Sequence, residues 1–315
     1  MPIRGLCASH TPLKDFHDPG PEAAREVAET FATARAWVAD FAPQLVLVFG
    51  PDHFNGFFYR LMPSFCVGAH AEAIGDWNTL SGELPVATGT AEALTEHLHQ
   101  KGVDAAVSYR MELDHGHTQA LQMLFGQTSL PPVLPVFINC AAPPRPPMAR
   151  VIALGEAVGD FLAELPDRVL IIGSGGLSHD PPMPSLVTAD PAVRTRIIEG
   201  GRLSAEARRA REARVIDEGR KQVSGESPAV ALNPEWDRGL LDLLLRGDFA
   251  ALSALKDEDI SREGGCGGHE IRSWVATAAA MSRVPGCTAQ VDMYRAIPLW
   301  VAGFAVMRFA SGRLG

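Results

Sequence analysis

Continuous apolar runs alternate along the first half of the chain with segments of helical periodicity. The apolar runs end at turn residues and have the length of buried strands. These predicted strands cover Ile3–Ala8, 45–50 (LVLVFG), 133–139 (VLPVFIN) and 168–173 (RVLIIG), with a shorter one over 105–109. Apolar residues three and four positions apart predict helices over 22–41, 87–101 and 148–165. Pro135 inside the third run indicates an edge position or a bulge, because proline donates no hydrogen bond to a neighbouring strand.

The second half of the chain is predicted to be mainly helical. Residues 190–222 are charged, with acidic and basic side chains interleaved, and are typical of a solvated helix. Residues 236–256 predict two short amphipathic helices and 270–282 a third, while the apolar segment 299–309 suits either the core or an interface. Strands that alternate with helices predict an α/β fold. We therefore expect a single domain over 1–315, with a β-sheet core flanked by helices and a helical C-terminal portion.

Composition narrows the class of protein. The 315 residues include 28 Lys and Arg against 37 Asp and Glu, which gives a formal net charge of −9. Such acidity argues against nucleic acid as a partner, since nucleic-acid binders carry basic surfaces. No segment reaches the roughly 20 apolar residues that a membrane span needs. The first residues do not resemble a secretory signal, so we expect a cytoplasmic protein. The five scattered cysteines are expected to be reduced thiols.

The positions of the histidines are the strongest chemical signal in the sequence. Of ten histidines, His10, His53, His115 and His179 each come just after a predicted strand or its turn. Side chains beyond the carboxyl ends of strands in an α/β sheet converge on one crevice. The four imidazoles are therefore expected to lie close together. His117 shares the turn of His115 and suits either the site or a surface position.

A carboxylate comes late in the chain, where a glycine-rich stretch (264–268) precedes Glu270 at the start of a predicted helix. Glu270 suits either a first-turn position favoured by the helix dipole or a ligand position. Two histidines and one carboxylate on separate elements form the facial triad that holds ferrous iron and leaves one face open. His10, His53 and Glu270 fit that set, with His115 and His179 as acid and base, but the pattern alone supplies only the candidates.

Longer motifs carry a resemblance to a known family. The segments SHTPL (9–13), PDHFNGFFY (51–59), LDHG (113–116) and GSGGLSHDPP (173–182) resemble those of the class III extradiol ring-cleaving dioxygenases. Further segments extend the resemblance over nearly the whole chain: AIGDW (73–77), GELPVA (82–87), PVLPVFIN (132–139), LNPEWD (232–237), HEIRSWVA (269–276) and IPLWVAGF (297–304).

The resemblance implies a function and assigns the candidate residues. It implies Fe(2+) as the cofactor, held by His10, His53 and Glu270, with His115 as the proton donor and His179 as the proton acceptor. The implied reaction opens the ring of a 3-substituted catechol with O2 and yields a 2-hydroxy-6-oxo-dienoate. It also favours a homo-oligomer. On general grounds Asp114, beside His115, is expected to orient that ring by hydrogen bonding.

The side chain of the catechol is the least defined part of this expectation. A propionate or cinnamate group is the leading candidate, and another 3-substituted catechol is the alternative. Arg60 and Arg110 are candidates for binding its carboxylate, with a surface role as the alternative for each. Two other classes remain open: a non-catalytic metal-binding paralogue, and a zinc hydrolase that uses the same three ligands.

Overall fold

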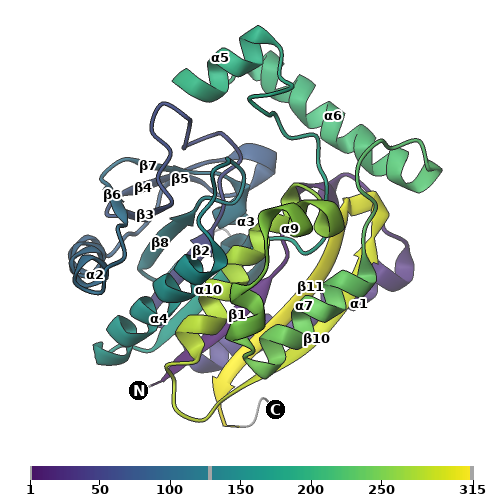
Figure 1. The fold of residues 1–315 in the computed structure, drawn as a ribbon. Coiled ribbons are helices and arrows are strands. Elements are labelled where there is room, and N and C mark those ends of the chain that lie inside the picture. Colours follow the sequence, from purple (N-terminus) through teal and green to yellow (C-terminus); the bar gives the residue numbers. More distant parts are fainter. Residues whose placement is uncertain (1, 127–129, 313–315) are drawn as a thin grey trace.

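A twisted eight-stranded sheet forms the centre of the molecule in the computed structural model, which describes residues 2–126 and 130–312 (Figure 1). The strand order is β10-β11-β1-β9-β2-β8-β3-β6. Their bounds are β1 Ile3–Ala8, β2 Leu45–Gly50, β3 Phe65–Gly68, β6 Ala106–Ser108, β8 Val133–Ile138, β9 Val169–Ser174, β10 Cys287–Ile297 and β11 Ala302–Ser311. A second sheet holds β4 (Ala71–Ile74), β5 (Ser81–Glu83) and β7 (Met111–Leu113) in the order β5-β4-β7.

The four central strands β1, β9, β2 and β8 are parallel, and they correspond to the apolar runs of the sequence. Strand β8 is interior, so the edge position suggested by Pro135 is wrong. The antiparallel pairing of β8 with β3 covers Val136 to Ile138 and stops before Pro135. Proline is tolerated there because no ladder partner on that side needs its missing N–H group.

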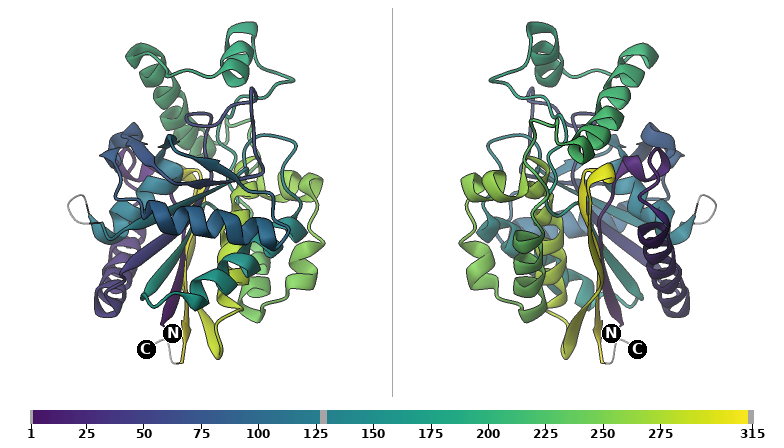
Figure 2. Two further views of the ribbon diagram at one scale, coloured as in Figure 1. Left: turned by 90° about the vertical axis from the view of Figure 1, so that its left-hand side faces the viewer. Right: turned by 90° about the vertical axis from the view of Figure 1, so that its right-hand side faces the viewer.

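Helices cover both faces of the large sheet (Figure 2). Leu47 and Phe49 of β2 pack on the face covered by α2 (Thr88–Gln100), α4 (Met148–Glu164) and α10 (Ile271–Met281). Val46 and Val48 face the opposite side, where α1 (Pro21–Phe41) and α3 (His115–Phe125) pack. This alternation along one buried strand is the signature of a sheet covered on both faces.

The C-terminal portion is helical only until residue 281. Its helices are α5 (Pro191–Glu199), α6 (Ala205–Ser224), α7 (Pro234–Arg246), α8 (Phe249–Ser253) and α9 (Asp257–Gly264). The chain then returns to the sheet as the antiparallel pair β10–β11, and β11 also pairs with β1. The apolar segment 299–309 therefore belongs mostly to a core strand. Four short 3-10 turns complete the described elements: η1 (Pro12–Asp15), η2 (Asp76–Asn78), η3 (Gly267–Glu270) and η4 (Pro298–Trp300).

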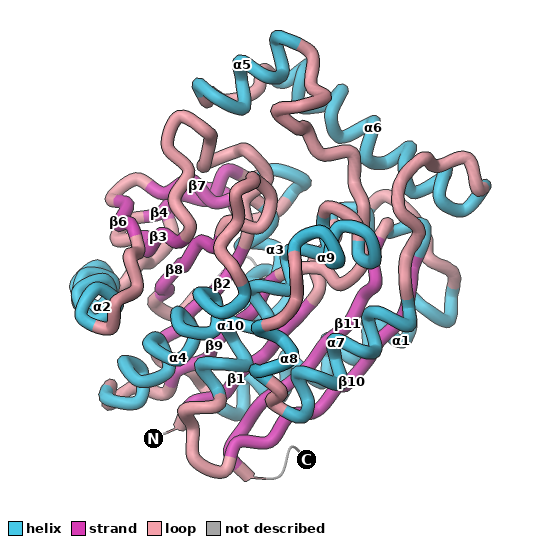
Figure 3. Tube along the Cα trace, in the orientation of Figure 1, coloured by secondary structure: helices cyan, strands magenta, loops and turns pink. Residues whose placement is uncertain are grey.

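The predicted α/β class with a central sheet flanked by helices is confirmed. Helices α5 and α6 lie at the top of Figure 1, apart from the sheet, and the tube drawing of Figure 3 shows the long loops that lead to them. Within the described ranges, no helix is both long and apolar enough to cross a bilayer.

Candidate metal centre

The site lies at the carboxyl ends of three neighbouring parallel strands. His10 follows β1, His179 follows β9 and His53 follows β2, and these strands are adjacent in the sheet. His115 is the first residue of α3, directly after β7 of the small sheet, and Glu270 is the last residue of η3. The structure thus brings together all five side chains that the sequence singled out, from five separate segments.

Each of the four imidazoles is held through its Nδ1 atom. The partners are Ser174 Oγ for His10 (3.1 Å), Asp114 Oδ2 for His53 (3.0 Å), Asp76 Oδ2 for His115 (2.6 Å) and the Leu177 carbonyl for His179 (3.0 Å). A bond at Nδ1 fixes the ring orientation and leaves Nε2 available for a metal or a proton.

The carboxylate of Glu270 lies among three of the Nε2 atoms. Its Oε1 is 3.1 Å from Nε2 of His53 and 3.3 Å from that of His179, and its Oε2 is 3.5 Å from Nε2 of His10. Imidazole and carboxylate ligands bind a transition metal at about 2.1 Å, which separates neighbouring ligand atoms by about 3 Å. The spacing of these donor atoms therefore fits a single metal ion bound between them.

A second, overlapping set of donors lies in the same place. One ring nitrogen from each of His10, His53 and His115 lies within 4.8 Å of the others. The rings of His53 and His115 stack at 4.3 Å between centroids, with 14° between their planes. The set that includes Glu270 combines two imidazoles with a carboxylate, which is the donor set of mononuclear ferrous centres.

Burial and neighbouring charges shift the pKa values of these groups in different directions. Burial lowers the pKa of His10 to about 3, which keeps the ring neutral as a ligand must be. Burial by itself raises the pKa of Glu270, but the charges of His179 and His10 bring it well below its usual value. In His53 the opposing effect of Asp114 and Glu270 outweighs burial, so its pKa is raised. The centre therefore offers an anionic oxygen together with at least one neutral imidazole.

The expected role of Asp114 is wrong, because its carboxylate orients His53 and not His115. Asp114 Oδ2 accepts hydrogen bonds from the backbone N–H of His53 (2.8 Å) and from the Asn55 amide (2.8 Å), besides the ring bond. The carboxylate on His115 is Asp76, whose Oδ1 also accepts from the His115 backbone N–H at 2.8 Å. Sequence reasoning missed this role of Asp76, although it lies in the AIGDW motif. The only indication of this role in the sequence is an acidic residue within that motif, and the motif does not follow a predicted strand.

Two glycines leave room for the His179 ring. A Cβ atom on Gly267 would lie 2.1 Å from Nε2 of His179, and one on Gly176 would lie 2.5 Å from its Nδ1. Gly176 also donates its N–H to Oε2 of Glu270 at 2.9 Å. Both glycine-rich stretches therefore allow close approach of backbone to the site.

A buried carboxylate that the sequence analysis did not single out fixes the loop carrying His179. Asp237 accepts hydrogen bonds from the backbone N–H (2.7 Å) and hydroxyl (2.8 Å) of Ser178, and from the Tyr294 hydroxyl (2.8 Å). It lies on α7, within the LNPEWD motif. Three donors to one carboxylate hold the loop in a single arrangement.

The four imidazoles line a small cavity of about 60 Å³, together with mostly apolar side chains. Neither Arg60 nor Arg110 is part of its lining, and both are exposed, so neither lies in the position expected of a carboxylate ligand. The arginine in the lining is Arg211 of α6. His117 is buried behind Gly50 and likewise does not line the cavity.

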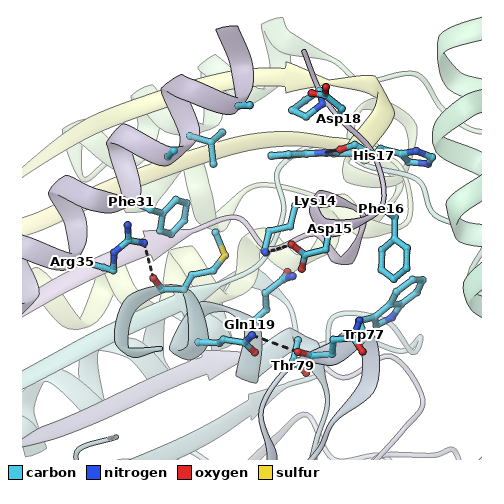
Figure 4. A pocket seen from close by; sticks show the side chains of 18 residues that line it. Lys14, Asp15, Phe16, His17, Asp18, Phe31, Arg35, Trp77, Thr79 and Gln119 are labelled. Carbon is cyan, nitrogen blue, oxygen red and sulfur yellow. Dashed lines mark hydrogen bonds and ion pairs between the residues drawn. The ribbon is translucent and has the colours of Figure 1, made fainter. Parts of the chain in front are cut away.

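A larger cavity of about 740 Å³ lies beside this site (Figure 4). It shares Trp77 and Trp300 with the histidine cavity. Its lining includes Lys14, Asp15 and Arg35 but none of the four clustered imidazoles. The donor set for a metal therefore belongs to the smaller cavity.

Comparison with known proteins identifies the class. The family model described as the catalytic LigB subunit of aromatic ring-opening dioxygenase matches residues 4–305. The chain belongs to this family, and it is an extradiol dioxygenase that opens aromatic rings.

Several relatives narrow the comparison further. The chain is 48% identical over 307 residues to the 2,3-dihydroxyphenylpropionate/2,3-dihydroxicinnamic acid 1,2-dioxygenase of Cupriavidus pinatubonensis, with 98% of each chain covered. A protein of the same name from Mycolicibacterium smegmatis is 47% identical, with 97% of this chain and 98% of the relative covered. The crystal structure of an uncharacterized Escherichia coli protein shares the fold, with a TM-score of 0.50 at 13% identity, and covers 98% of this chain and 99% of that one.

Proposed function

We propose that the protein uses ferrous iron, held by His10, His53 and Glu270, to open the ring of a catechol that carries a propionate or cinnamate side chain. On 3-(2,3-dihydroxyphenyl)propanoate the product would be 2-hydroxy-6-oxonona-2,4-dienedioate, with both atoms of O2 incorporated. The observation that supports this proposal most is the convergence of four imidazoles on one cavity, three of them with Nε2 at the Glu270 carboxylate, in a chain of the LigB family.

Bound iron would supply the chemistry that proteins lack, by drawing the two catechol oxygens and O2 together and exchanging electrons between them. Three ligands from the protein would leave one face of the metal open for them. The remaining residues then position the ring and move protons.

His179 is proposed as the proton acceptor. Its Nδ1 is bonded to the Leu177 carbonyl, which requires the hydrogen to be on Nδ1 and leaves Nε2 as the basic atom. Although burial lowers the pKa of His179, the neighbouring Glu270 charge raises it overall. A more basic Nε2 beside the metal position suits removal of a proton from a catechol hydroxyl.

His115 is proposed as the proton donor. Asp76 holds its Nδ1–H and its backbone N–H, and the ring lines the cavity together with His10 and His53. A carboxylate at Nδ1 stabilises the doubly protonated ring, which can then give its Nε2 proton to the oxygen that leaves as the ring opens. The two histidines thus act at different stages of one reaction.

The test is anaerobic loading of the protein with Fe(II), followed by oxygen and a panel of 3-substituted catechols. We expect oxygen uptake and a yellow ring-opened product, with the acid-bearing catechols as the best substrates. His115→Ala and His179→Ala should keep iron but lose turnover by roughly 10²- to 10⁴-fold, the usual contribution of general acid–base catalysis. His53→Ala should lose iron.

Two results would contradict the proposal. Full activity of His179→Ala would remove the proton acceptor from the mechanism. Bound metal with no oxygen uptake on any catechol would point to a metal-binding paralogue or to a hydrolase.

A cytoplasmic location and a homo-oligomeric state are part of the same proposal and rest on the sequence and its resemblance. Light scattering of the purified protein measures the mass of the assembly. Cell fractionation tests the location.

A further inference from the structure

Arg211 is the one arginine or lysine among the described residues that line the histidine cavity. It lies on α6, the charged helix that the sequence predicted to be solvated. The helix is anchored beside the site, because its Ile216 carbonyl bonds to Nε2 of His17 at 2.7 Å, and Gly219 packs against the Leu299 carbonyl. A cation on this helix therefore reaches the cavity from the side opposite the sheet.

The guanidinium of Arg211 has only neutral protein partners. Its Nη2 donates to the His53 carbonyl at 2.9 Å, and its Nη1 lies 3.4 Å from Oδ1 of Asn55. Within residues 2–126 and 130–312, no carboxylate oxygen lies within 4.0 Å of the Arg211 guanidinium nitrogens, so Arg211 forms no ion pair there. By contrast, the buried Arg308 binds Asp292 through two nitrogens, at 2.5 Å and 2.8 Å.

The nearby buried carboxylates are already engaged elsewhere. Asp114 binds His53, Asp76 binds His115, and Asp52 accepts the backbone N–H groups of residues 55, 56 and 57. Arg211 itself is partly buried, and both of its hydrogen bonds to the protein go to neutral groups. A cation in such a place can still bind a ligand that supplies a negative charge.

The rest of the cavity wall suits an organic side chain. Leu13, Met183 and Val215 line it, together with Trp77 and Trp300. A catechol with its hydroxyls at the imidazoles would place its 3-substituent along this apolar wall. Guanidinium binds a carboxylate through two parallel hydrogen bonds, which gives both strength and orientation.

We propose that Arg211 binds the carboxylate of the catechol's 3-substituent and so selects anionic over neutral side chains. This inference rests on the proposed function, because it takes the imidazole cluster as the place where the catechol oxygens bind. It makes Arg211 a specificity residue, while the ring-opening chemistry stays with the four imidazoles and Glu270.

The experiment compares two substrates of nearly the same shape on four iron-loaded proteins. The substrates are 3-(2,3-dihydroxyphenyl)propanoate and its neutral amide, and the proteins are the wild type, Arg211→Gln, Arg211→Lys and Arg214→Gln. Arg214 is an exposed arginine of the same helix and serves as the matched control.

We expect the wild type to prefer the acid over the amide. Arg211→Gln should raise KM for the acid roughly 10- to 100-fold, the range for a lost hydrogen bond to a charged group, and should lower kcat/KM for the amide much less, because the amide carbonyl accepts only a weaker, neutral hydrogen bond. Arg211→Lys should recover part of the loss, and Arg214→Gln should behave as the wild type.

A binding measurement separates selectivity from damage to the iron site, because Arg211 also contacts the His53 carbonyl. Calorimetry with 3-phenylpropanoate, which has the carboxylate but no catechol oxygens, is done on the metal-free proteins. Its affinity should fall in Arg211→Gln and stay unchanged in Arg214→Gln.

Three results would overturn the inference, and each is distinct from failure of the proposed function. The first is an equal loss for acid and amide in Arg211→Gln, and the second is unchanged affinity for 3-phenylpropanoate. The third is a wild type that cleaves acid and amide equally well. A wild type that cleaves no catechol at all would instead refute the proposed function.

Discussion

Replacing Asp76 by Asn tests whether a buried carboxylate prepares His115 for proton donation. Asp76 is 5% exposed, and its Oδ2 lies 2.6 Å from Nδ1 of His115 while its Oδ1 accepts the backbone N–H of the same residue. Asparagine keeps the shape and can still accept the backbone bond through its oxygen. It then turns its NH2 group toward Nδ1, which favours the wrong tautomer and no longer stabilises the protonated ring.

The magnitude follows from the bond that is lost. A hydrogen bond to a charged group contributes about 1.5–3 kcal/mol, and each 1.36 kcal/mol of barrier changes a rate about tenfold. We therefore expect kcat of Asp76→Asn to fall roughly 10- to 150-fold, with iron content and KM near those of the wild type. His115→Ala should fall at least as far, since it removes the donor itself.

The assay measures iron with a chromogenic chelator and turnover by the yellow product under the same loading conditions. Glu83→Gln is the matched control, because Glu83 pairs with the exposed His70 at 2.9 Å and neither residue lines the cavity. The double variant Asp76→Asn with His115→Ala should be no slower than His115→Ala, because Asp76 acts only through that ring. Loss of iron in Asp76→Asn, or a double variant whose defects multiply, would refute this reasoning.

Three further predictions concern residues around the same centre. Asp114→Asn should weaken iron binding about 10- to 100-fold, measured by titration with a competing chelator, since Asp114 orients a proposed ligand; unchanged affinity would speak against that role. Gly267→Ala should push the His179 ring aside and reduce kcat strongly while iron is retained, so a variant of normal kcat would show that the ring tolerates the shift. Burial raises the pKa of the Cys66 and Cys140 thiols to about 12, so both should resist a thiol reagent at pH 8 until the protein unfolds. Because unfolded thiols ionise near pH 8.5, the free energy of unfolding should also fall as the pH rises beyond that value.

The central sheet and the four strand-end histidines could be predicted because they follow from local patterns, whereas the pattern left Glu270 open and only the family resemblance assigned it to the site. The apolar runs of β1, β2 and β9 are continuous and end at turn residues, so both the strands and the histidines that follow them can be recognised directly from the sequence. Parallel pairing then brings their carboxyl ends together. Which of these histidines become neighbours depends on the order of the strands in the sheet, and no single segment of the sequence specifies that order.

Asp76 could not be found in this way, because it lies in a short 3-10 turn with left-handed backbone at Trp77 and Asn78. Such a turn has no periodicity, and its contact with His115 joins residues 39 positions apart. The expectation that Asp114 orients His115 used sequence proximity, but the side chain of Asp114 turns toward the end of β2. Adjacent residues at a helix start point in different directions, so proximity in sequence was a poor guide.

Arg211 escaped the sequence analysis for a different reason. Periodicity averages over many residues, and a single inward arginine among the exposed charges of α6 leaves the helix looking solvated on all sides. The contact that places Arg211 at the cavity is its hydrogen bond to the His53 carbonyl, which joins residues 158 positions apart. Val215, one turn further along the same helix, also lines the cavity. Two inward residues four positions apart define only a short stretch of one helix face, and such a stretch is too short to produce a helical period in the sequence.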